Sequence, residues 1–458
     1  MYAPALHGGL FDPAHLRRLF DDRARLSAML AFESALARAE AACGLLSPSH
    51  AATIVACCEP ALYDPETIGE EAAEGGNPAI PLVRALMAKV QERDPEAAAY
   101  VHWGATSQDV IDTATVLCLR EALDAIEIVL DEVIAVCAEL VEAHRDTLRT
   151  ARTLLQPALP TTFGFEVAGW LDALLRHRMR LSEMRPRLLV VQLGGAAGTL
   201  AALGDAGPDV VMALADALGL ECPDLPWHGQ RDRIGELAGW LAGLSGSLGK
   251  IATDLVLSMQ AEVDELREPP APGRGGSSTL PQKRNPVGAI LVRQAALRAP
   301  GLAATLFATA VQEFERGAGG WHAEWETLAD LVVTVGGALV GVRQILTGLE
   351  VDSERMRRRL ADSRGLLLAE AVQMALAPRL GRIEAKKRVE AACREAIARD
   401  LGLGEVLQAD PAIRAALGEE RLAQLLVPEN YLGAARKFAN AVLQRWRAQR
   451  RGGGNGRA

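Results

Sequence analysis

The sequence predicts an all-α protein, and three observations support that fold class. Hydrophobic residues make up 49% of the 458 residues, aromatic residues only 4%, and Ala and Leu dominate the apolar set, a composition that favours helices over sheets. Two long segments carry apolar residues at alternating steps of three and four, the spacing of helices in a bundle. Elsewhere we find no internal repeat and no alternating strand pattern. A chain of this length is expected to form two or three domains.

The N-terminal part, residues 1–104, is expected to form a domain of shorter helices. Pairs of residues that end or begin helices interrupt it at three points: Cys43-Gly44, Ser47-Pro48 and Asn77-Pro78. Gly and Pro at such points break helices and mark connections.

The first long helix is predicted from a segment, residues 105–156, that contains neither Gly nor Pro. Its apolar seam consists of Val116, Leu119, Leu123, Ile126, Leu130, Val133, Cys137 and Leu140. Thr106 or Ser107 is expected to cap the helix, with Asp109 on its first turn. This interpretation places Thr153 and Gln156 at the far end of the same helix.

The second long helix is predicted over residues 231–267, with a seam that runs from Ile234 to Leu266. At a rise of roughly 1.5 Å per residue it would be about 55 Å long, and burying it requires partner helices of similar length, from this chain or from other subunits. Further helices are expected over 164–190, 287–316 with a kink at Pro300, and 324–350. We therefore predict an N-terminal domain (1–104), a central long-helix bundle (105–350), a C-terminal helical domain (351–446) and a disordered tail (447–458).

Composition argues against several classes of protein. The net charge of −9 is unlike the basic footprint of a nucleic-acid binder. The N-terminal residues lack the pattern of a signal peptide, and charge-free stretches are interrupted, so no membrane span is predicted. Seven cysteines without a CxxC pair indicate reduced thiols in a cytoplasmic protein. Without an HExxH, a Walker loop or a GxGxxG in a strand–helix context, neither a metal nor an organic cofactor is expected.

One segment does not fit a helical protein: PGRGGSSTLPQKRNP, residues 272–286, with three prolines, three glycines, two adjacent serines and three basic residues. No helix or strand tolerates this composition. It is either a solvated linker or a loop that chemistry requires, and composition alone leaves the two alternatives balanced.

Two other stretches are polar. VHWGATSQDVIDTA, residues 101–114, clusters His102, Thr106 and Ser107 before the first long helix. Its groups either cap the helix or hold an anion at the helix N-terminus, and both can be true. ARTLLQPALPTTFG, residues 151–164, carries Thr153 and Gln156, and by itself it is best interpreted as a loop that ends a helix.

Together these three stretches resemble the three shared regions of the fumarase/aspartase superfamily, in the same order. GSSTLPQKRNP is similar to the signature of that superfamily, with Leu280 where Met is usual. The resemblance covers roughly residues 10–440. Four further stretches resemble the branch of cycloisomerases that lactonise 3-carboxymuconate, rather than the purine or arginine lyases: RPRLLVVQLGGAAGTLAALG, PWHGQRDR, QEFERGAGGWHAEWETLADL and LLLAEAVQMALAPRLGR.

The resemblance implies a three-domain, mainly helical homotetramer whose core is a bundle of long helices from four subunits. Each active site would combine the three regions from three chains. It implies no metal and no cofactor, and a small tricarboxylate as substrate.

By position in the motif, Ser277 matches the catalytic serine of the superfamily. A serine hydroxyl needs positive potential to act in proton transfer, and nearby backbone amides with Lys283 would supply it. Gly and Pro would let the loop close over substrate as a lid. The resemblance assigns substrate binding to Lys283, Asn285, Thr106, Ser107, Thr153 and Gln156. His102, Gln230 and Arg316 are weaker candidates with equally good structural roles, and His322 and Asn77 are weaker still.

One departure from the related lyases bears on the reaction. Lyases that release an amine carry His directly after the Arg-Thr of the second region, where this chain has Leu154. An amine leaves badly without a proton, whereas a carboxylate leaves as a stable anion. We therefore expect lactonisation of 3-carboxymuconate. The alternatives are a superfamily lyase that eliminates a weakly basic anion such as nitrite to give fumarate, and a non-catalytic scaffold.

Overall fold

The structure of the chain is a computed structural model that describes residues 13–270, 275–276, 280 and 283–453. In this part of the chain the backbone is mainly helical, with only two small two-stranded sheets. The prediction of an all-α protein is therefore confirmed. Ser277 and the centre of the loop that carries it lie outside the described residues.

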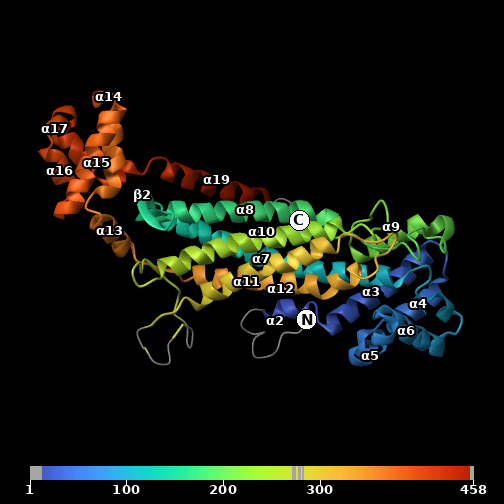
Figure 1. Cartoon of the computed structure of the whole chain (residues 1–458). Coiled ribbons are helices and arrows are strands. Elements are labelled where there is room, and N and C mark those ends of the chain that lie inside the picture. Colours follow the sequence, from blue (N-terminus) through green and yellow to red (C-terminus); the bar gives the residue numbers. More distant parts are fainter. Residues whose placement is uncertain (1–12, 271–274, 277–279, 281–282, 454–458) are drawn as a thin grey trace. The chain divides into compact units, whose positions relative to one another are not determined.

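The chain divides into two compact units, each built from three separate segments. The first unit comprises Met1–Asp131, His177–Gly249 and Leu291–Gly341, and the second comprises Glu132–Arg176, Lys250–Ile290 and Val342–Ala458. Five long helices have residues in both units: α7 (Ser107–Ala143), α8 (Phe163–Leu188), α10 (Asp232–Ser258), α11 (Val287–Ala308) and α12 (Gly320–Leu346). All five are labelled in Figure 1.

Shorter helices make up the rest of the first unit. They are α2 (Ala14–Arg18), α3 (Asp22–Ala42), α4 (Pro48–Cys57), η1 (Pro60–Leu62), α5 (Pro65–Gly75), α6 (Ala79–Arg93), η2 (Ala97–Tyr100), η3 (Gly204–Ala206) and α9 (Gly207–Leu218). Asp21, Ser47 and Asp64 cap α3, α4 and α5 by accepting a bond from a backbone N–H of the first turn. All three predicted breaks are confirmed, and α3 packs against α4 and α9 (Figure 1).

The apolar seams of the long helices form the core, as predicted. In α7 the seven seam residues from Val116 to Cys137 are all at most 1% exposed, and in α10 the same holds from Leu237 to Leu255. Burying each such leucine contributes about 1.5–3 kcal/mol. α8 and α12 match their predicted ranges closely, whereas α11 ends at Ala308, eight residues before the predicted limit of 316. Pro300 lies inside α11.

Both long helices end earlier than the sequence predicted. α7 ends at Ala143 rather than at 156, and α10 ends at Ser258 rather than at 267. The backbone N–H of Glu265 donates to the carbonyl of Ser258 (2.9 Å) and so turns the chain out of α10. Arg149 donates to the hydroxyl of the same serine (2.7 Å). These contacts between distant residues replace the helical continuation that periodicity alone favours.

The segment after α7 is a β-hairpin, which corrects the prediction that Thr153 and Gln156 lie on a helix. β1 (Leu148–Thr153) pairs antiparallel with β2 (Gln156–Thr162), and Thr153 lies opposite Gln156. The two residues of the turn, Leu154 and Leu155, have φ of 50° and 66°. Positive φ at both central residues is the geometry of a two-residue hairpin turn.

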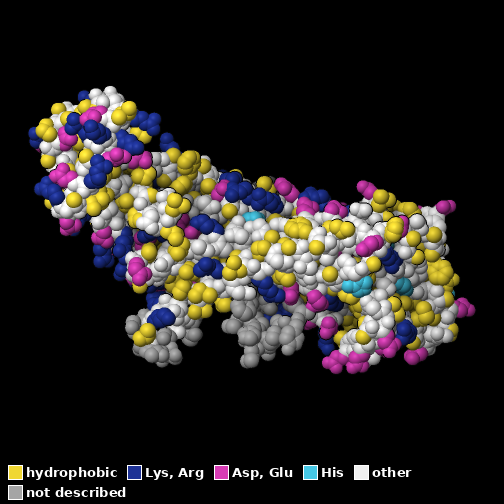
Figure 2. Space-filling model, viewed as in Figure 1, with side chains coloured by type: hydrophobic (Ala, Val, Ile, Leu, Met, Phe, Trp, Pro, Cys, Tyr) yellow, Lys and Arg dark blue, Asp and Glu magenta, His cyan; other side chains and the backbone are white. Residues whose placement is uncertain are grey.

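The second unit also contains the C-terminal helices. Its remaining elements are β3 (Leu266–Arg267), β4 (Glu350–Val351), α13 (Ser353–Asp362), η4 (Leu366–Leu368), α14 (Ala369–Leu380), α15 (Arg382–Arg399), α16 (Leu403–Ala409), α17 (Pro411–Leu417), α18 (Glu419–Leu425), η5 (Pro428–Tyr431) and α19 (Ala435–Gly453). α14 packs against α15 and α17 around a core that includes Val372, Leu376 and Leu403 (Figure 1). Figure 2 shows basic and acidic side chains intermixed over these helices, unlike the one-signed surface of a nucleic-acid binder.

Among the described residues, one helix, α12, is long and apolar enough to cross a membrane. Its most apolar window has a mean hydropathy of 1.5. However, 67% of that window is buried inside the structure. Leu331, Val332 and Val335 are fully buried. The composition of α12 is therefore that of a core helix.

All seven cysteines are free thiols, as predicted. Burial raises the pKa of Cys118 to about 11, with smaller opposing and supporting effects of nearby charges. Such a thiol is protonated at neutral pH and behaves as a small apolar side chain.

Glu40 on α3 is a buried acid that makes stability depend on pH. It is 1% exposed, and its Oε1 has no hydrogen-bond partner in the described structure. Burial, reinforced by the charge of Glu33, raises the pKa of Glu40 to about 9. Because the folded pKa lies above the unfolded one, the folded chain favours the neutral acid, and stability is lost as pH rises from about 4.5 towards 9.

We expect the Glu40→Gln variant to be more stable than the wild type at pH 9, by roughly 2–6 kcal/mol, because the amide never has to ionise. At pH 5 the two proteins should differ by less than about 1 kcal/mol. Urea unfolding at both pH values measures the difference. An advantage of equal size at pH 5 and pH 9 would contradict a titrating Glu40.

Candidate active site

The N-terminus of α7 presents two of the predicted site residues. The helix begins at Ser107, and the backbone N–H of Thr106 donates to Oδ2 of Asp109 (3.0 Å), which is one half of a capping box. Thr106 and Ser107 are partly exposed, and no hydrogen bond of either hydroxyl is found in the described part of the chain. Both hydroxyls, together with the positive end of the helix dipole, are therefore available to an anion.

Asp109 ties three segments of the first unit together. Its Oδ1 accepts from the backbone N–H of Gly194 (3.0 Å) and lies 2.6 Å from Nε2 of His228. Its Oδ2 accepts from Thr106 and from the backbone N–H of Gly195 (3.0 Å). The carboxylate is 0% exposed and makes four charge-assisted hydrogen bonds, which is how a buried charge is stabilised.

The glycines beside Asp109 are required by this geometry. A Cβ on Gly194 would lie 2.7 Å from Cε1 of His228, and Gly195 has a φ of 69° with its Cβ position 2.7 Å from the carbonyl oxygen of Gly104. A larger residue would separate the backbone N–H groups from the carboxylate.

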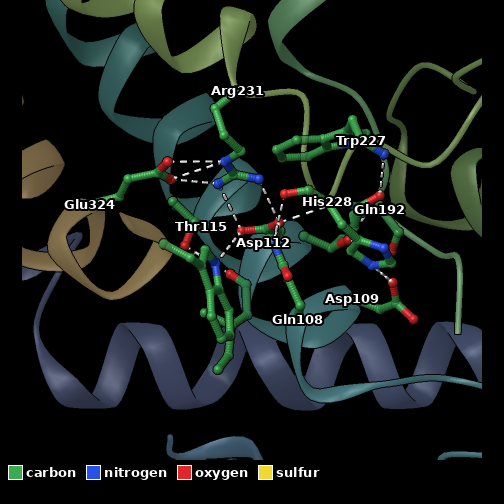
Figure 3. A network of polar contacts seen from close by, with 12 residues as sticks. Gln108, Asp109, Asp112, Thr115, Gln192, Trp227, His228, Arg231 and Glu324 are labelled. Carbon is green, nitrogen blue, oxygen red and sulfur yellow. Dashed lines mark hydrogen bonds and ion pairs between the residues drawn. The ribbon is translucent and has the colours of Figure 1, made fainter. Parts of the chain in front are cut away.

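A second buried network lies one turn further along α7 (Figure 3). Arg231 donates from Nε to Glu324 (3.0 Å) and from Nη1 to Asp112 (2.8 Å), and all three side chains are at most 3% exposed. Asp112 also accepts from Nε1 of Trp321 (2.9 Å) and from the side-chain amide of Gln108 (3.2 Å). Burial raises the pKa of Glu324, although Arg231 opposes the shift.

This network fixes the segment that precedes α10. The side-chain oxygen of Gln192 accepts from the backbone N–H of Trp227 (2.9 Å), and Gln108 donates to the carbonyl of His228 (3.1 Å). Between His228 and the buried Arg231, Gln230 is exposed, and its side chain makes no hydrogen bond that the described structure shows. The candidate Gln230 is thus held at the surface by its buried neighbours.

Arg316 reaches the same region of the first unit. Its guanidinium donates to the carbonyl of Gly195 (2.9 Å), the residue whose N–H contacts Asp109. Its Nε is buried and has no partner among the described residues. One donor of Arg316 is therefore unused, which favours a ligand contact over a purely structural role.

The two weakest candidates have local roles. The side chain of Asn77 accepts from the backbone N–H of Ala79 (3.1 Å) at the start of α6. The ring of His322 packs against Trp321 and Trp325, with centroids 5.2 and 4.7 Å away.

In the second unit, buried charges hold the β1–β2 hairpin. Arg152 donates to both oxygens of Glu265 (3.1 and 2.7 Å), and Arg149 donates to the same carboxylate (3.0 Å). Glu265 is 0% exposed, so its negative charge depends on the two guanidinium groups. Thr153 and Gln156 are exposed at the end of the hairpin that these ion pairs anchor.

The ends of the predicted catalytic loop are held within the second unit. Arg284 donates to Glu350 (3.0 Å) and to the carbonyl of Glu268 (3.0 Å). Glu268 in turn caps α11 by accepting from the backbone N–H groups of Gly288 (3.1 Å) and Ala289 (2.7 Å). Lys283 is exposed, and Asn285 donates from its side chain to the carbonyl of Gly275 (3.2 Å).

The predicted site residues fall into two groups. His102, Thr106, Ser107, Gln230 and Arg316 belong to the first unit, and Thr153, Gln156, Lys283 and Asn285 belong to the second. The sequence interpretation missed the buried groups that position them: Glu33, Asp112, Arg231, Glu265 and Glu324. Among the described residues, no cluster of three or more His, Cys, Asp or Glu side chains has the arrangement of a metal site.

Comparison with known proteins identifies the family. The model of a family described as "Lyase" matches residues 12–301, and that of "Adenylosuccinate lyase C-terminus" matches residues 365–442. The chain belongs to this lyase family, the fumarase/aspartase superfamily whose motifs it carries.

Individual relatives narrow the assignment. The 3-carboxy-cis,cis-muconate cycloisomerase of Pseudomonas aeruginosa is 51% identical over 441 residues, 96% of each chain. The crystal structure of the 3-carboxy-cis,cis-muconate lactonizing enzyme from Pseudomonas putida superposes with a TM-score of 0.91 at 49% identity, covering 96% of this chain and 98% of that one. Nitrosuccinate lyase of Streptomyces davaonensis is 41% identical over 94% of each chain.

Proposed function

We propose that the chain is a cycloisomerase that converts 3-carboxy-cis,cis-muconate to 4-carboxymuconolactone, a step in the breakdown of aromatic compounds. The observation that carries this proposal is the 51% identity to a curated cycloisomerase along 96% of both chains. Chemistry supports it independently, because the described structure places the apolar Leu154 at the tip of the β1–β2 hairpin, 97% exposed. A leaving or attacking carboxylate needs no proton donor at that position.

The reaction is an isomerisation in which no atom is lost. One substrate carboxylate attacks the conjugated double bond and closes a five-membered lactone ring. The displaced electron pair moves onto an adjacent activated carboxylate as an enediolate. Ser277 then delivers a proton to the neighbouring carbon and regains one from solvent, and in the reverse direction it removes that proton.

Substrate binding requires groups that recognise three carboxylates. At the N-terminus of α7, Thr106 and Ser107 offer hydroxyls and the helix dipole. Lys283 supplies a positive charge, and Thr153 and Gln156 supply hydrogen bonds. The remaining candidates are Asn285, Gln230, Arg316 and His102.

The proposal includes a cytoplasmic homotetramer in which each active site combines groups from different chains. One observation supports assembly: α11 exposes large apolar side chains, with Leu297 82% and Phe307 51% exposed. Apolar side chains so exposed on a long helix are typical of a surface that another chain covers.

The test is turnover of 3-carboxymuconate by the purified full-length chain. The conjugated-diene absorbance in the ultraviolet should disappear, with kcat in the usual enzymatic range of roughly 1–10³ s⁻¹. Fumarate appearing from nitrosuccinate, with no loss of carboxymuconate, would instead support the lyase that the 41% identical relative suggests. If neither compound is turned over, the scaffold alternative stands.

A further inference from the structure

A buried carboxylate contacts one of the weaker candidates in the first unit. Oε1 of Glu33 lies 2.6 Å from Nδ1 of His102, and the two side chains are 1% and 15% exposed. Glu33 is on α3, 69 residues earlier in the chain. Neither the motifs nor the family comparison assigns Glu33 a role.

The backbone of His102 is held in an uncommon conformation. Its φ is 58°, in the left-handed region, which costs a residue other than glycine about 1–3 kcal/mol and persists only where the surroundings impose it. The residue lies in the turn that leads into α7, four residues before Thr106. The bond to Glu33 therefore fixes the ring of a residue in the same turn that leads to the hydroxyls that we assign to substrate binding.

The chemistry of the pair decides which ring nitrogen faces outward. A carboxylate only accepts hydrogen bonds, so Nδ1 of His102 must carry the proton that it shares with Glu33. Nε2 then remains for another partner, and no hydrogen bond to it is found within the described ranges of the chain. When the ring is protonated, Nε2 is a charged donor, which suits a carboxylate acceptor.

We infer that Glu33 is a positioning residue that holds His102 as a cationic donor whose Nε2–H binds a carboxylate of the substrate. This inference rests on the proposed function for the identity of that carboxylate. Glu33 itself does not touch the substrate: it acts through the orientation and the charge of the imidazole ring.

The negative charges near His102 favour the protonated, cationic form of its ring. Burial lowers the pKa of His102, but the charge and the hydrogen bond of Glu33, with a contribution from Asp109 on α7, raise it by more, so that the net shift is upward. Two further titratable groups lie near Glu33: burial and, second, the charge of Glu33 raise the pKa of Glu40 on α3 to about 9 and raise the pKa of the Cys58 thiol after α4, so that both are neutral over most of the pH range tested below. The protonated ring is lost only as pH rises through this raised pKa.

Steady-state kinetics of the full-length chain between pH 5 and 9 test the inference. We expect the basic limb of kcat/KM to move at least about one pH unit lower in Glu33→Gln. At pH 8, KM for 3-carboxymuconate should rise about tenfold or more while kcat changes less than about threefold, because a charge-assisted contact is lost. Glu40→Gln, the same substitution two turns along α3, should leave the profile unmoved.

Titration of the ring is a readout that does not need the substrate. The imidazole NMR signals of His102 should report a pKa at least about one unit lower in Glu33→Gln than in the wild type. An unchanged His102 pKa, or an unchanged pH profile in an active enzyme, would overturn the inference. If the wild type does not turn over carboxymuconate, the proposed function fails, while the titration still decides whether Glu33 controls the ring.

A second substitution covers the case in which Glu33→Gln does not fold. His102→Gln keeps an amide that can donate to Glu33 but removes the cationic Nε2–H. KM should again rise about tenfold or more, and the basic limb assigned to His102 should disappear. A KM within about twofold of the wild type would show that His102 does not bind the substrate.

Discussion

Replacing Ser277 by alanine is expected to lower kcat for 3-carboxymuconate by about 10³-fold or more, because proton transfer by a positioned side chain contributes about 10²–10⁴-fold. The substitution removes one hydroxyl and leaves the groups assigned to carboxylate binding in place. KM should therefore change by less than about threefold. Loss of the diene absorbance under single-turnover and steady-state conditions measures both constants.

The neighbouring serine provides a matched control. Ser278→Ala removes the same hydroxyl from the next residue but keeps the backbone amide, which is the group that we assign to positive potential in the loop. We expect less than a tenfold loss of kcat. Should Ser278→Ala abolish turnover while Ser277→Ala retains it, the assignment of the proton donor within the loop is wrong, although the reaction itself can stand.

The sequence predicted the helices well because their buried apolar residues recur at regular steps along the chain. Residues at steps of three and four must face the same side of a helix, so the seams of α7 and α10 could be found without knowing what covers them. The same rule, applied further, would have found part of the site. Asp109 and Asp112 continue the α7 seam backwards from Val116, and Arg231 continues the α10 seam backwards from Ile234.

Charged residues at seam positions indicate buried polar groups, and the structure shows all three buried. The sequence interpretation stopped at the last apolar residue of each seam and treated Asp109 only as an acidic residue on the first turn of the helix. No pattern within one segment could identify the ion-pair partners of these buried charges. Glu324 is 93 residues from Arg231, and Glu265 is 116 residues from Arg149. Such pairs are set by the tertiary fold.

The hairpin was missed for a local reason. Two-residue hairpin turns need positive φ at both central positions and usually use Asn-Gly or Gly. This chain has Leu154 and Leu155 there, so the usual signal is absent. The bonds from Arg149 and Arg152 to the buried Glu265 hold the strands in place. Pro157 and Pro160 were the remaining clue, since neither fits inside a helix.

Asp109→Asn is expected to destabilise the protein by about 3 kcal/mol. The asparagine has the shape of the aspartate, but one of its two acceptors becomes an NH₂ group. The backbone N–H groups of Thr106 and Gly195 point at one oxygen, and that of Gly194 points at the other. Backbone N–H groups cannot reverse, so the amide leaves at least one buried donor facing another donor.

The expected loss of stability follows from the hydrogen-bond donors that still surround residue 109 after the substitution. His228 can change its tautomer and accept from the new amide, whereas the N–H of Gly194 cannot, and the negative charge that attracted all four donors is gone. Urea unfolding measures the change, with Asp205→Asn as the matched control. Asp205 is exposed in η3, and its substitution should alter stability by less than about 0.5 kcal/mol. Equal small effects of both substitutions would mean that the three segments meeting at Asp109 are held together by their apolar packing, and that the carboxylate adds little to it.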